Sequence, residues 1–343
     1  MNFRKLFLLG AAATMLGAVG VRVAGAGEYD DGMSVRYYEV LKGKKVAFVP
    51  ISMGFDITEG WYAGMKRQAD ALGYEIIVRD PAWKTDVGAQ ALTQLIAEKP
   101  DLLIVHNPDM QVYARLIQKA QKAGIPVLQV NDKSTAVSDA FVGVDEYQLG
   151  VEQAKAMVKL CGKDAGKNGK IAIMQGVLTN PASAVTIQGV EDVLKEHPDI
   201  NVVSNQSADW DASKAHAVAT TVLKQNPDLC GYIGFWDVMD VGTAAAIKEA
   251  GKQGAVYLVT SGAGNETTAC ANLANNNFAV DVSYDVQEQA RDINSVIKML
   301  LQQPPNPVGS RPFALYTPIK VLTKETLRPG ACWTLDDMKK YGG

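Results

Sequence analysis

Short apolar runs alternate with amphipathic stretches along most of this chain, beginning at residue 46. Val46 to Val49 is an apolar run that stops at Pro50, and a loop of small, aromatic and acidic residues follows it. Beyond the loop, apolar residues recur at helical spacing at Trp61, Met65, Ala69 and Leu72. This order predicts a strand, a loop and a helix.

The same order of elements recurs down the chain. Further strands are predicted at 74–78, 102–105, 126–130, 141–144, 170–174, 200–205, 232–235, 257–260 and 279–283, with a last extended segment at 313–321. Helices are predicted between them at 86–98, 113–123, 149–160, 184–196, 213–225, 241–250 and 287–301. Strands that alternate with helices of this length predict parallel sheets in an α/β fold.

The pattern restarts near residue 141, which predicts two successive α/β units. No stretch of Gly, Ser or Pro is long enough to separate independent domains. We therefore expect two lobes joined by three crossing segments, at 141–145, 280–285 and 315–320. The expected first lobe comprises 42–144 and 284–316, and the second comprises 145–283 and 317–343.

The first 26 residues have the pattern of a secretory signal peptide. Arg4 and Lys5 precede an apolar run at 6–21, and Ala24 and Ala26 flank a glycine as in a cleavage site. A membrane anchor is the alternative, but the apolar run is short for a spanning helix and is interrupted by glycines. We expect cleavage after Ala26 and a protein exported to the periplasm.

The four cysteines all lie beyond residue 160, at Cys161, Cys230, Cys270 and Cys332, and none forms a C-x-x-C pair. In an oxidising compartment they predict two disulfides. Of the three possible connectivities we favour Cys161 with Cys230 and Cys270 with Cys332. The net charge of −3 argues against a nucleic-acid surface.

Polar and aromatic side chains gather where the predicted strands end, which is the edge at which ligands bind in open parallel sheets. The candidates are Ser52, Phe55, Asp56, Trp83, Asn107, Asn131, Asp132, Asp145, Trp210, Trp236, Asp237, Ser261, Tyr284 and Asp285. Asn, Asp and Ser also cap helices and form turns, so about half of the polar candidates are expected to do only that. Tryptophan has no capping role, which favours Trp210 and Trp236 as site residues, whereas Trp61 and Trp333 are expected in the core.

Aromatic rings together with carboxylates and amides fit a molecule with many hydroxyl groups. A ring packs against C–H faces, and a carboxylate accepts hydroxyl protons in strong hydrogen bonds. Lys133 is the one cation near these positions, which disfavours a phosphate ligand. No nucleophile-elbow, zinc-protease or P-loop motif occurs, so we expect a binding protein without cofactor or metal. Paired carboxylates keep a glycoside-acting enzyme open as an alternative.

The order and spacing of several segments resemble the periplasmic ribose-binding-protein family, the sugar-binding type I substrate-binding proteins of ABC transporters. The matching segments lie within residues 42–322 and include AGIPVLQVND, VGVDEYQLG, ADWD and GFWDVMDVGTAAAIKEAG. The resemblance implies two Rossmann-like lobes that close on a monosaccharide or sugar alcohol, delivery to the membrane permease of an ABC importer, and a monomer. A periplasmic sugar sensor for a receptor kinase or chemoreceptor is the alternative that the sequence leaves open.

The resemblance also places site residues. The first-loop ligands of the family match Ser52, Phe55 and Asp56, its stacking aromatic residue matches Trp210, and Trp236 stands where the family has asparagine, followed by Asp237. Asn131 and Asp132 stand where the family has an acidic residue and an arginine, and a second family arginine falls near Thr186. The family aspartate after the strand at 257–260 is also replaced, by Ser261 or its neighbour. These losses imply a ligand other than ribose or galactose, and we expect a different sugar or a linear polyol such as a tetritol or pentitol.

Overall fold

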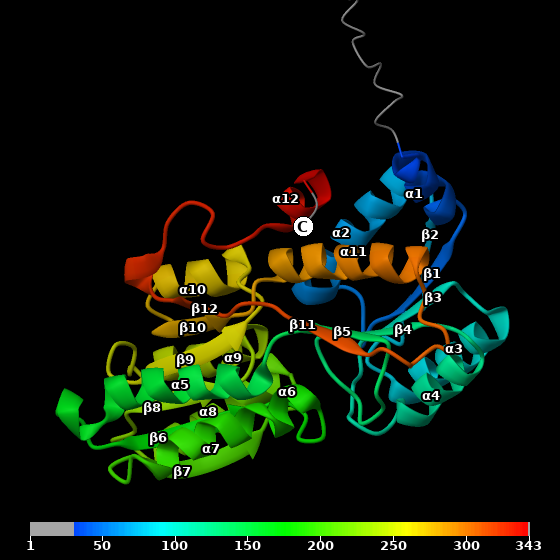
Figure 1. Ribbon diagram of the computed structural model, residues 1–343. Helices are drawn as coiled ribbons and strands as arrows, with labels where there is room; N and C mark the ends of the chain where they lie inside the picture. Colours follow the sequence, from blue (N-terminus) through cyan, green and yellow to red (C-terminus); the bar gives the residue numbers. More distant parts are fainter. Residues whose placement is uncertain (1–30, 342–343) are drawn as a thin grey trace, which may run out of the picture.

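The structure is a computed structural model in which residues 31–341 are described, and it consists of two lobes lying side by side (Figure 1). Each lobe is built on one six-stranded sheet with helices on both faces. The fold is therefore α/β with two lobes, as the alternating pattern predicted. The predicted signal peptide lies outside the described residues.

The sheet of the first lobe has the strand order β11-β5-β4-β3-β1-β2 and is parallel throughout. Helices α2 and α11 pack together on one face, and α3 and α4 pack together on the other (Figure 1). Helix α1, which the sequence pattern did not predict, packs against α11. The elements are α1 (Met33–Leu41), β1 (Lys45–Val49), α2 (Asp56–Leu72), β2 (Glu75–Val78), α3 (Thr85–Glu98), β3 (Leu102–Val105), α4 (Ala114–Lys122), β4 (Val127–Val130), β5 (Ala140–Gly143), α11 (Val286–Gln302) and β11 (Phe313–Tyr316).

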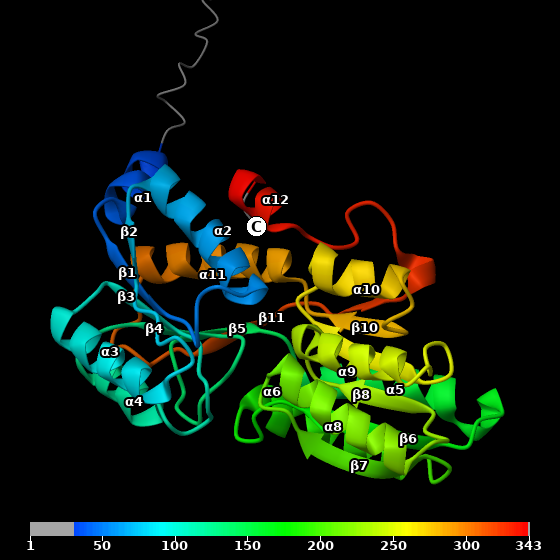
Figure 2. The same cartoon turned by 180° about the vertical axis from the view of Figure 1, so that it is seen from behind.

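The sheet of the second lobe repeats this arrangement with the order β12-β10-β9-β8-β6-β7, and β12 is its antiparallel strand. Helices α5 and α7 pack together, as do α8 and α9 (Figure 2). The elements are α5 (Glu146–Cys161), η2 (Lys163–Ala165), β6 (Lys170–Gln175), α6 (Pro181–Ala184), α7 (Thr186–Lys195), β7 (Asn201–Ser207), α8 (Ala212–Gln225), β8 (Gly231–Gly234), α9 (Asp237–Glu249), β9 (Tyr257–Gly262), η3 (Glu266–Cys270), α10 (Ala271–Ala274), β10 (Val280–Ser283), β12 (Lys320–Leu322), η4 (Lys324–Thr326) and α12 (Leu335–Tyr341).

The chain passes between the two sheets three times, between β5 and α5, between β10 and α11, and between β11 and β12. The predicted extended segment at 313–321 is in fact two short strands in different sheets. Strand β11 pairs parallel with β5, whereas β12 pairs antiparallel with β10. The change of sheet within this segment makes the third crossing.

The C-terminal segment contacts both lobes. Cys161 is bonded to Cys230 and Cys270 to Cys332, which confirms the favoured disulfide pairing. The second disulfide ties the C-terminal segment to the π-helical turn η3 of the second lobe. Helix α12 then packs on α2 of the first lobe, although the sequence assigns residues 317–343 to the second lobe (Figure 2).

The apolar runs of the sequence form the buried strands. All four residues of β3, all four of β4 and the last four of β1 are buried, as expected for parallel strands that helices cover on both faces. Trp61 and Trp333 are buried in the core, as predicted. Between residues 31 and 341, no helix is long and apolar enough to cross a membrane.

Candidate binding cleft

The strand order of each sheet fixes where a ligand can bind. In the first lobe the order in which successive strands are added to the sheet reverses between the parallel strands β1 and β3, and in the second lobe between β6 and β8. Helices connected to the two strands at such a point leave on opposite faces, so a crevice opens at their carboxyl ends. The loops that follow these strands are therefore expected to carry the site.

A cavity with about 470 Å³ of empty space, partly open to solvent, lies at these strand ends and takes side chains from both lobes. The lining residues are Ile51, Phe55, Ile57, Trp83, His106, Asn131, Asp132, Glu146, Leu149, Asn180, Ala182, Trp210, Phe235, Trp236 and Tyr284. The cavity thus has the position at which open parallel sheets bind small molecules.

Aromatic rings form one wall of the cavity. Phe55 is stacked on Trp83 with 5.2 Å between the ring centroids, and its ring also meets the Trp236 ring edge-to-face at 5.7 Å. Trp210 in turn meets Trp236 edge-to-face at 6.1 Å. Because Phe55 and Trp83 belong to the first lobe and the other two to the second, the aromatic contacts join the lobes across the cavity.

Several residues at this site have an uncommon backbone conformation. Trp83 and Trp210 have φ values of 65° and 64°, and Asn131 has a φ of 57°, in the left-handed region that non-glycine residues seldom adopt. Such residues often occur at functional sites, where the surrounding structure offsets the strain. Gly176, just after β6, has a related role, because a Cβ atom there would lie 2.1 Å from the indole of Trp210. A glycine at this position therefore allows the Trp210 ring to lie against the backbone.

A second set of lining side chains is polar, and we refer to it as the polar wall. The Nε2 atom of His106 lies 2.9 Å from Oδ2 of Asp132, and Nδ2 of Asn180 donates to the same oxygen over 3.2 Å. His106 and Asp132 are 2% and 3% exposed, yet Nδ1 of His106 and Oδ1 of Asp132 have no hydrogen-bond partner in the protein. Buried polar atoms are nearly always paired, so these two atoms point to a ligand in the cavity.

Glu146 adds a second carboxyl group to the polar wall. It opens α5 directly after the first crossing, and its Oε2 accepts a hydrogen bond from Oγ1 of Thr186 at 3.0 Å. Burial, and next the charge of Asp132, raise the pKa of Glu146 well above its ordinary value, although the Thr186 bond acts in the opposite direction. The neutral carboxyl group is therefore favoured, since ionisation carries the penalty of burying a charge.

Of the residues proposed from the sequence, the structure brings one group together around the cavity: Phe55, Trp83, Asn131, Asp132, Trp210, Trp236 and Tyr284. Asp56 and Asp237 lie beside this group as the first residues of α2 and α9. Burial raises the pKa of Asp56 to about 6 and that of Asp237 well above its usual range. One oxygen of each is buried without a partner.

The other proposed residues lie outside the cavity lining, and their side chains form hydrogen bonds within the protein. Asp145 caps α5 and Asp285 caps α11, each accepting a hydrogen bond from a backbone N–H. The side chain of Asn107 donates to Gln129 and to a backbone carbonyl. The hydroxyls of Ser52 and Ser261 donate to backbone carbonyls, and Thr186 positions Glu146.

Sequence reasoning did not select three polar lining residues, namely His106, Glu146 and Asn180. Glu146 follows Asp145 directly, and His106 precedes Asn107, so each stands one position from a selected residue. Asn180 lies in the loop after β6, whose length left the position of its side chains open. In each case the position after a strand indicated the region of the site, but it could not show which of the neighbouring residues lines the cavity.

Asn180 also connects the two lobes directly. Its Nδ2 atom lies 3.4 Å from the backbone oxygen of Asn107 and 3.3 Å from that of Pro108. Beside it, the backbone N–H of Met110 donates to the carbonyl of Thr179 over 3.2 Å. The loop after β6 therefore touches the loop after β3 across the cleft, and the structure shows the lobes closed.

The comparisons with known proteins establish the family. A model of the periplasmic binding protein domain matches residues 46–305, which is most of the chain. This chain belongs to the periplasmic binding protein family. Within residues 31–341 of this periplasmic binding protein, no group of three or more His, Cys, Asp or Glu side chains is arranged to hold a metal ion.

Individual relatives of this periplasmic binding protein are more distant. It is 26% identical over 234 residues to the D-apiose import binding protein of Actinobacillus succinogenes, covering 67% of this chain and 73% of the relative. It is 27% identical over 248 residues to the xylitol-binding protein of Mycolicibacterium smegmatis, covering 72% and 68%. Among solved structures, an ABC transporter solute-binding protein of Agrobacterium vitis bound to α-D-tagatopyranose superposes with a TM-score of 0.73 at 22% identity, covering 84% of this chain and 97% of the other. At that identity the superposition supports the fold.

Proposed function

We propose that this protein captures a monosaccharide or sugar alcohol in the cleft between its lobes and delivers it to the permease of an ABC importer. The observation that carries the proposal is the composition of one cavity, which is lined by aromatic rings from both lobes together with carboxyl and amide groups. The rings would cover the C–H faces of a sugar, and the polar wall would bind its hydroxyl groups. The names of the relatives support the same class of ligand.

The cavity also supports binding rather than catalysis. Each of its two lining carboxyl groups, Asp132 and Glu146, is held by hydrogen bonds within the protein. Relatives of this chain carry the names of binding proteins. In the proposed function the protein acts in the periplasm as a monomer, and the surfaces brought together by closure of the lobes signal occupancy to the permease.

Isothermal titration calorimetry of the mature protein with a panel of pentoses, hexoses, tetritols and pentitols tests this proposal. We expect one or more members to bind with micromolar affinity or better, which corresponds to about −8 kcal/mol. Binding of none, together with turnover of a chromogenic glycoside, would replace the proposal with an enzymatic one.

Replacing Trp83 tests the assigned site in the same titration, because its ring lines the cavity while half of its surface is exposed. Trp83→Ala should weaken binding about tenfold, since an aromatic stack contributes on the order of 1 kcal/mol beyond the area that it buries. Tyr38→Ala is the matched control, because Tyr38 is a similarly exposed aromatic residue on α1 and does not line the cavity. Equal affinities of the two variants would contradict the assigned site.

A further inference from the structure

The polar wall of the cavity is rich in hydrogen-bond acceptors. Asp132 uses Oδ2 to contact Nε2 of His106 and to accept a hydrogen bond from Asn180. Its other carboxyl oxygen, Oδ1, is buried without a protein partner. Glu146 supplies a further carboxyl group to the same cavity. A ligand that pairs with this wall must therefore bring several donor hydrogens.

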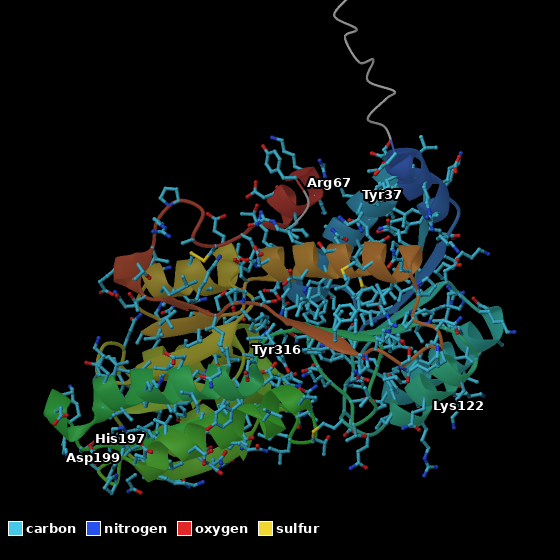
Figure 3. The ribbon with its side chains drawn as sticks, in the orientation of Figure 1. Tyr37, Arg67, Lys122, His197, Asp199 and Tyr316 are labelled. Atoms are coloured by element: carbon cyan, nitrogen blue, oxygen red, sulfur yellow. A yellow bond between two sulfur atoms is a disulfide. The ribbon has the colours of Figure 1, made fainter. Side chains whose placement is uncertain are left out.

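No lysine or arginine lines the cavity within the described part of the chain. Lys133, the cation that the sequence places near the strand ends, is engaged elsewhere. Its ammonium lies 4.3 Å from the ring centroid of Phe141 and 4.5 Å from that of Tyr316, and it donates to the Tyr316 hydroxyl. Figure 3 labels Tyr316 close to where the two lobes meet. The lining carboxyl groups Asp132 and Glu146 consequently have no basic lysine or arginine partner among the described residues.

The aromatic wall also favours a positively charged ligand. The faces of aromatic rings carry partial negative charge, and they attract a cation within about 6 Å of the ring centroid. Tryptophan is the strongest of these rings, and Trp83, Trp210 and Trp236 all line the cavity. The carboxyl groups and the ring faces would therefore stabilise positive charge on a bound molecule, whereas the indole N–H of Trp236, which is buried without a partner, would donate to a ligand oxygen.

We propose that the ligand is a sugar or sugar alcohol that carries a protonated amino group, bound between the carboxyl groups of Asp132 and Glu146 and the aromatic wall. This inference rests on the proposed function and narrows its ligand class. An ammonium group offers three donors and needs no donor in return, whereas each hydroxyl group is both donor and acceptor. An ammonium ion also offsets the cost of burying two carboxylates. The raised pKa of Glu146 has the same physical origin, because burial penalises its ionised form when no cation is bound.

Calorimetry with matched pairs of molecules at pH 7.5 tests the inference. The pairs are D-glucose with D-glucosamine, D-galactose with D-galactosamine, and D-sorbitol with D-glucamine, and the N-acetylated form of each amine keeps the nitrogen but removes the charge. We expect the amine of at least one pair to bind about tenfold or more tightly than its hydroxyl and acetylated counterparts, a difference of about 1.4 kcal/mol.

Glu146→Gln provides the matched variant, because it keeps the shape of the side chain and an acceptor for Thr186. It should reduce the preference for the amine over the hydroxyl compound by about tenfold. Glu249→Gln removes a charge from α9 outside the cavity, where the Glu249 side chain is 67% exposed, and should leave the preference unchanged.

The outcomes separate the two proposals. If hydroxyl compounds bind as tightly as their amines or more tightly, the inference of an amino group is overturned and the proposed function stands. If no member of any pair and none of the neutral panel binds, both are overturned. If Glu146→Gln leaves the amine preference of the wild type intact, the assignment of the amino group to this wall is wrong.

Discussion

Asn180 is the residue through which the second lobe contacts the polar wall of the first. It is almost fully buried, and its side-chain amide donates toward Asp132 and two backbone carbonyls of the first lobe. Its side-chain oxygen meanwhile caps α6 by accepting a hydrogen bond from the Ala182 N–H. One side chain thus couples the closure of the lobes to the geometry of the cavity.

We predict that Asn180→Ala speeds ligand dissociation about five- to twentyfold, because net hydrogen bonds of about 1 kcal/mol each are lost from the closed state. Stopped-flow tryptophan fluorescence measures the rate with the ligand that the calorimetric panel identifies. Asn168→Ala is the matched control, since Asn168 also accepts from a backbone N–H two residues on, but lies at the surface of the second lobe outside the cavity. Equal dissociation rates in the two variants would show that Asn180 does not hold the cleft closed.

Asp281 has a buried carboxyl group, and neither of its oxygens has a hydrogen-bond partner. Burial, and then the neighbouring charges of Asp240 and Asp56, raise the pKa of Asp281 to about 7. The folded state therefore holds a proton on Asp281 that the unfolded state has released, so the contribution of Asp281 to the free energy of unfolding falls as the pH rises from about 4 to 7.

The variant Asp281→Asn should remove this slope. We expect its free energy of unfolding, relative to that of the wild type, to rise by about 1 kcal/mol for each pH unit between pH 5 and 7. Urea denaturation at pH 5, 6 and 7 measures it, with Asp164→Asn at the exposed turn η2 as the control. Parallel stability profiles of wild type and Asp281→Asn would contradict the raised pKa.

Residue types differ in how far the sequence alone could assign them. Tryptophans after strands were selected because they have no local role, and Trp83, Trp210 and Trp236 do line the cavity. Aspartates after strands were ambiguous, and Asp145 and Asp285 cap helices. Trp83 and Trp210 have left-handed backbone conformations, which set the direction of their side chains. Neither residue propensity nor hydrophobic periodicity predicts such a conformation.

At the scale of elements, the buried strands and long helices were predicted best because their apolar residues are continuous or periodic. Strand β3 occupies the predicted residues 102–105. The short helix α12 has two apolar residues three positions apart, Leu335 and Met338, which is too little for a periodic signal. Its place on α2 depends on tertiary packing, which also decides that 313–321 is divided between two sheets.

The segment that leads to α12 is held to the second lobe at two adjacent residues. Cys332 is bonded to Cys270, and the indole of Trp333 donates to the backbone of Ala263 over 2.8 Å. Helix α12 itself lies on the first lobe, where Arg67 of α2 donates to the backbone oxygen of Lys340. The disulfide therefore fixes the position at which the C-terminal segment leaves the second lobe and crosses to the first.

Replacing both Cys270 and Cys332 by serine should lower the free energy of unfolding by about 2–4 kcal/mol, because the disulfide closes a long loop. It should also release α12, so that the amides of residues 335–341 exchange hydrogen faster. Replacing Cys161 and Cys230 is the matched control, since that disulfide closes a loop of similar length (69 against 62 residues of separation) within the second lobe. If α12 stays equally protected in both double variants, the disulfide does not anchor it.

At the scale of the whole molecule, duplication of one sheet topology explains the position of the site. Each lobe presents the ends of its central strands to the other, so a small cavity receives rings and carboxyl groups from both. Opening of the lobes would separate Phe55 from Trp236 and Asn180 from Asp132. Binding energy gained in the cleft would then be available to hold the lobes closed.

Native mass spectrometry of the mature protein, purified from the periplasm of cells that produce it, tests directly whether the cleft binds a sugar or sugar alcohol. We expect one small molecule per chain, which fragmentation identifies as a sugar or sugar alcohol, and its loss from a Trp210→Ala variant that is still folded. A bound molecule without a hydroxylated carbon chain, or a sugar retained equally by the variant, would show that the cleft does not have this role.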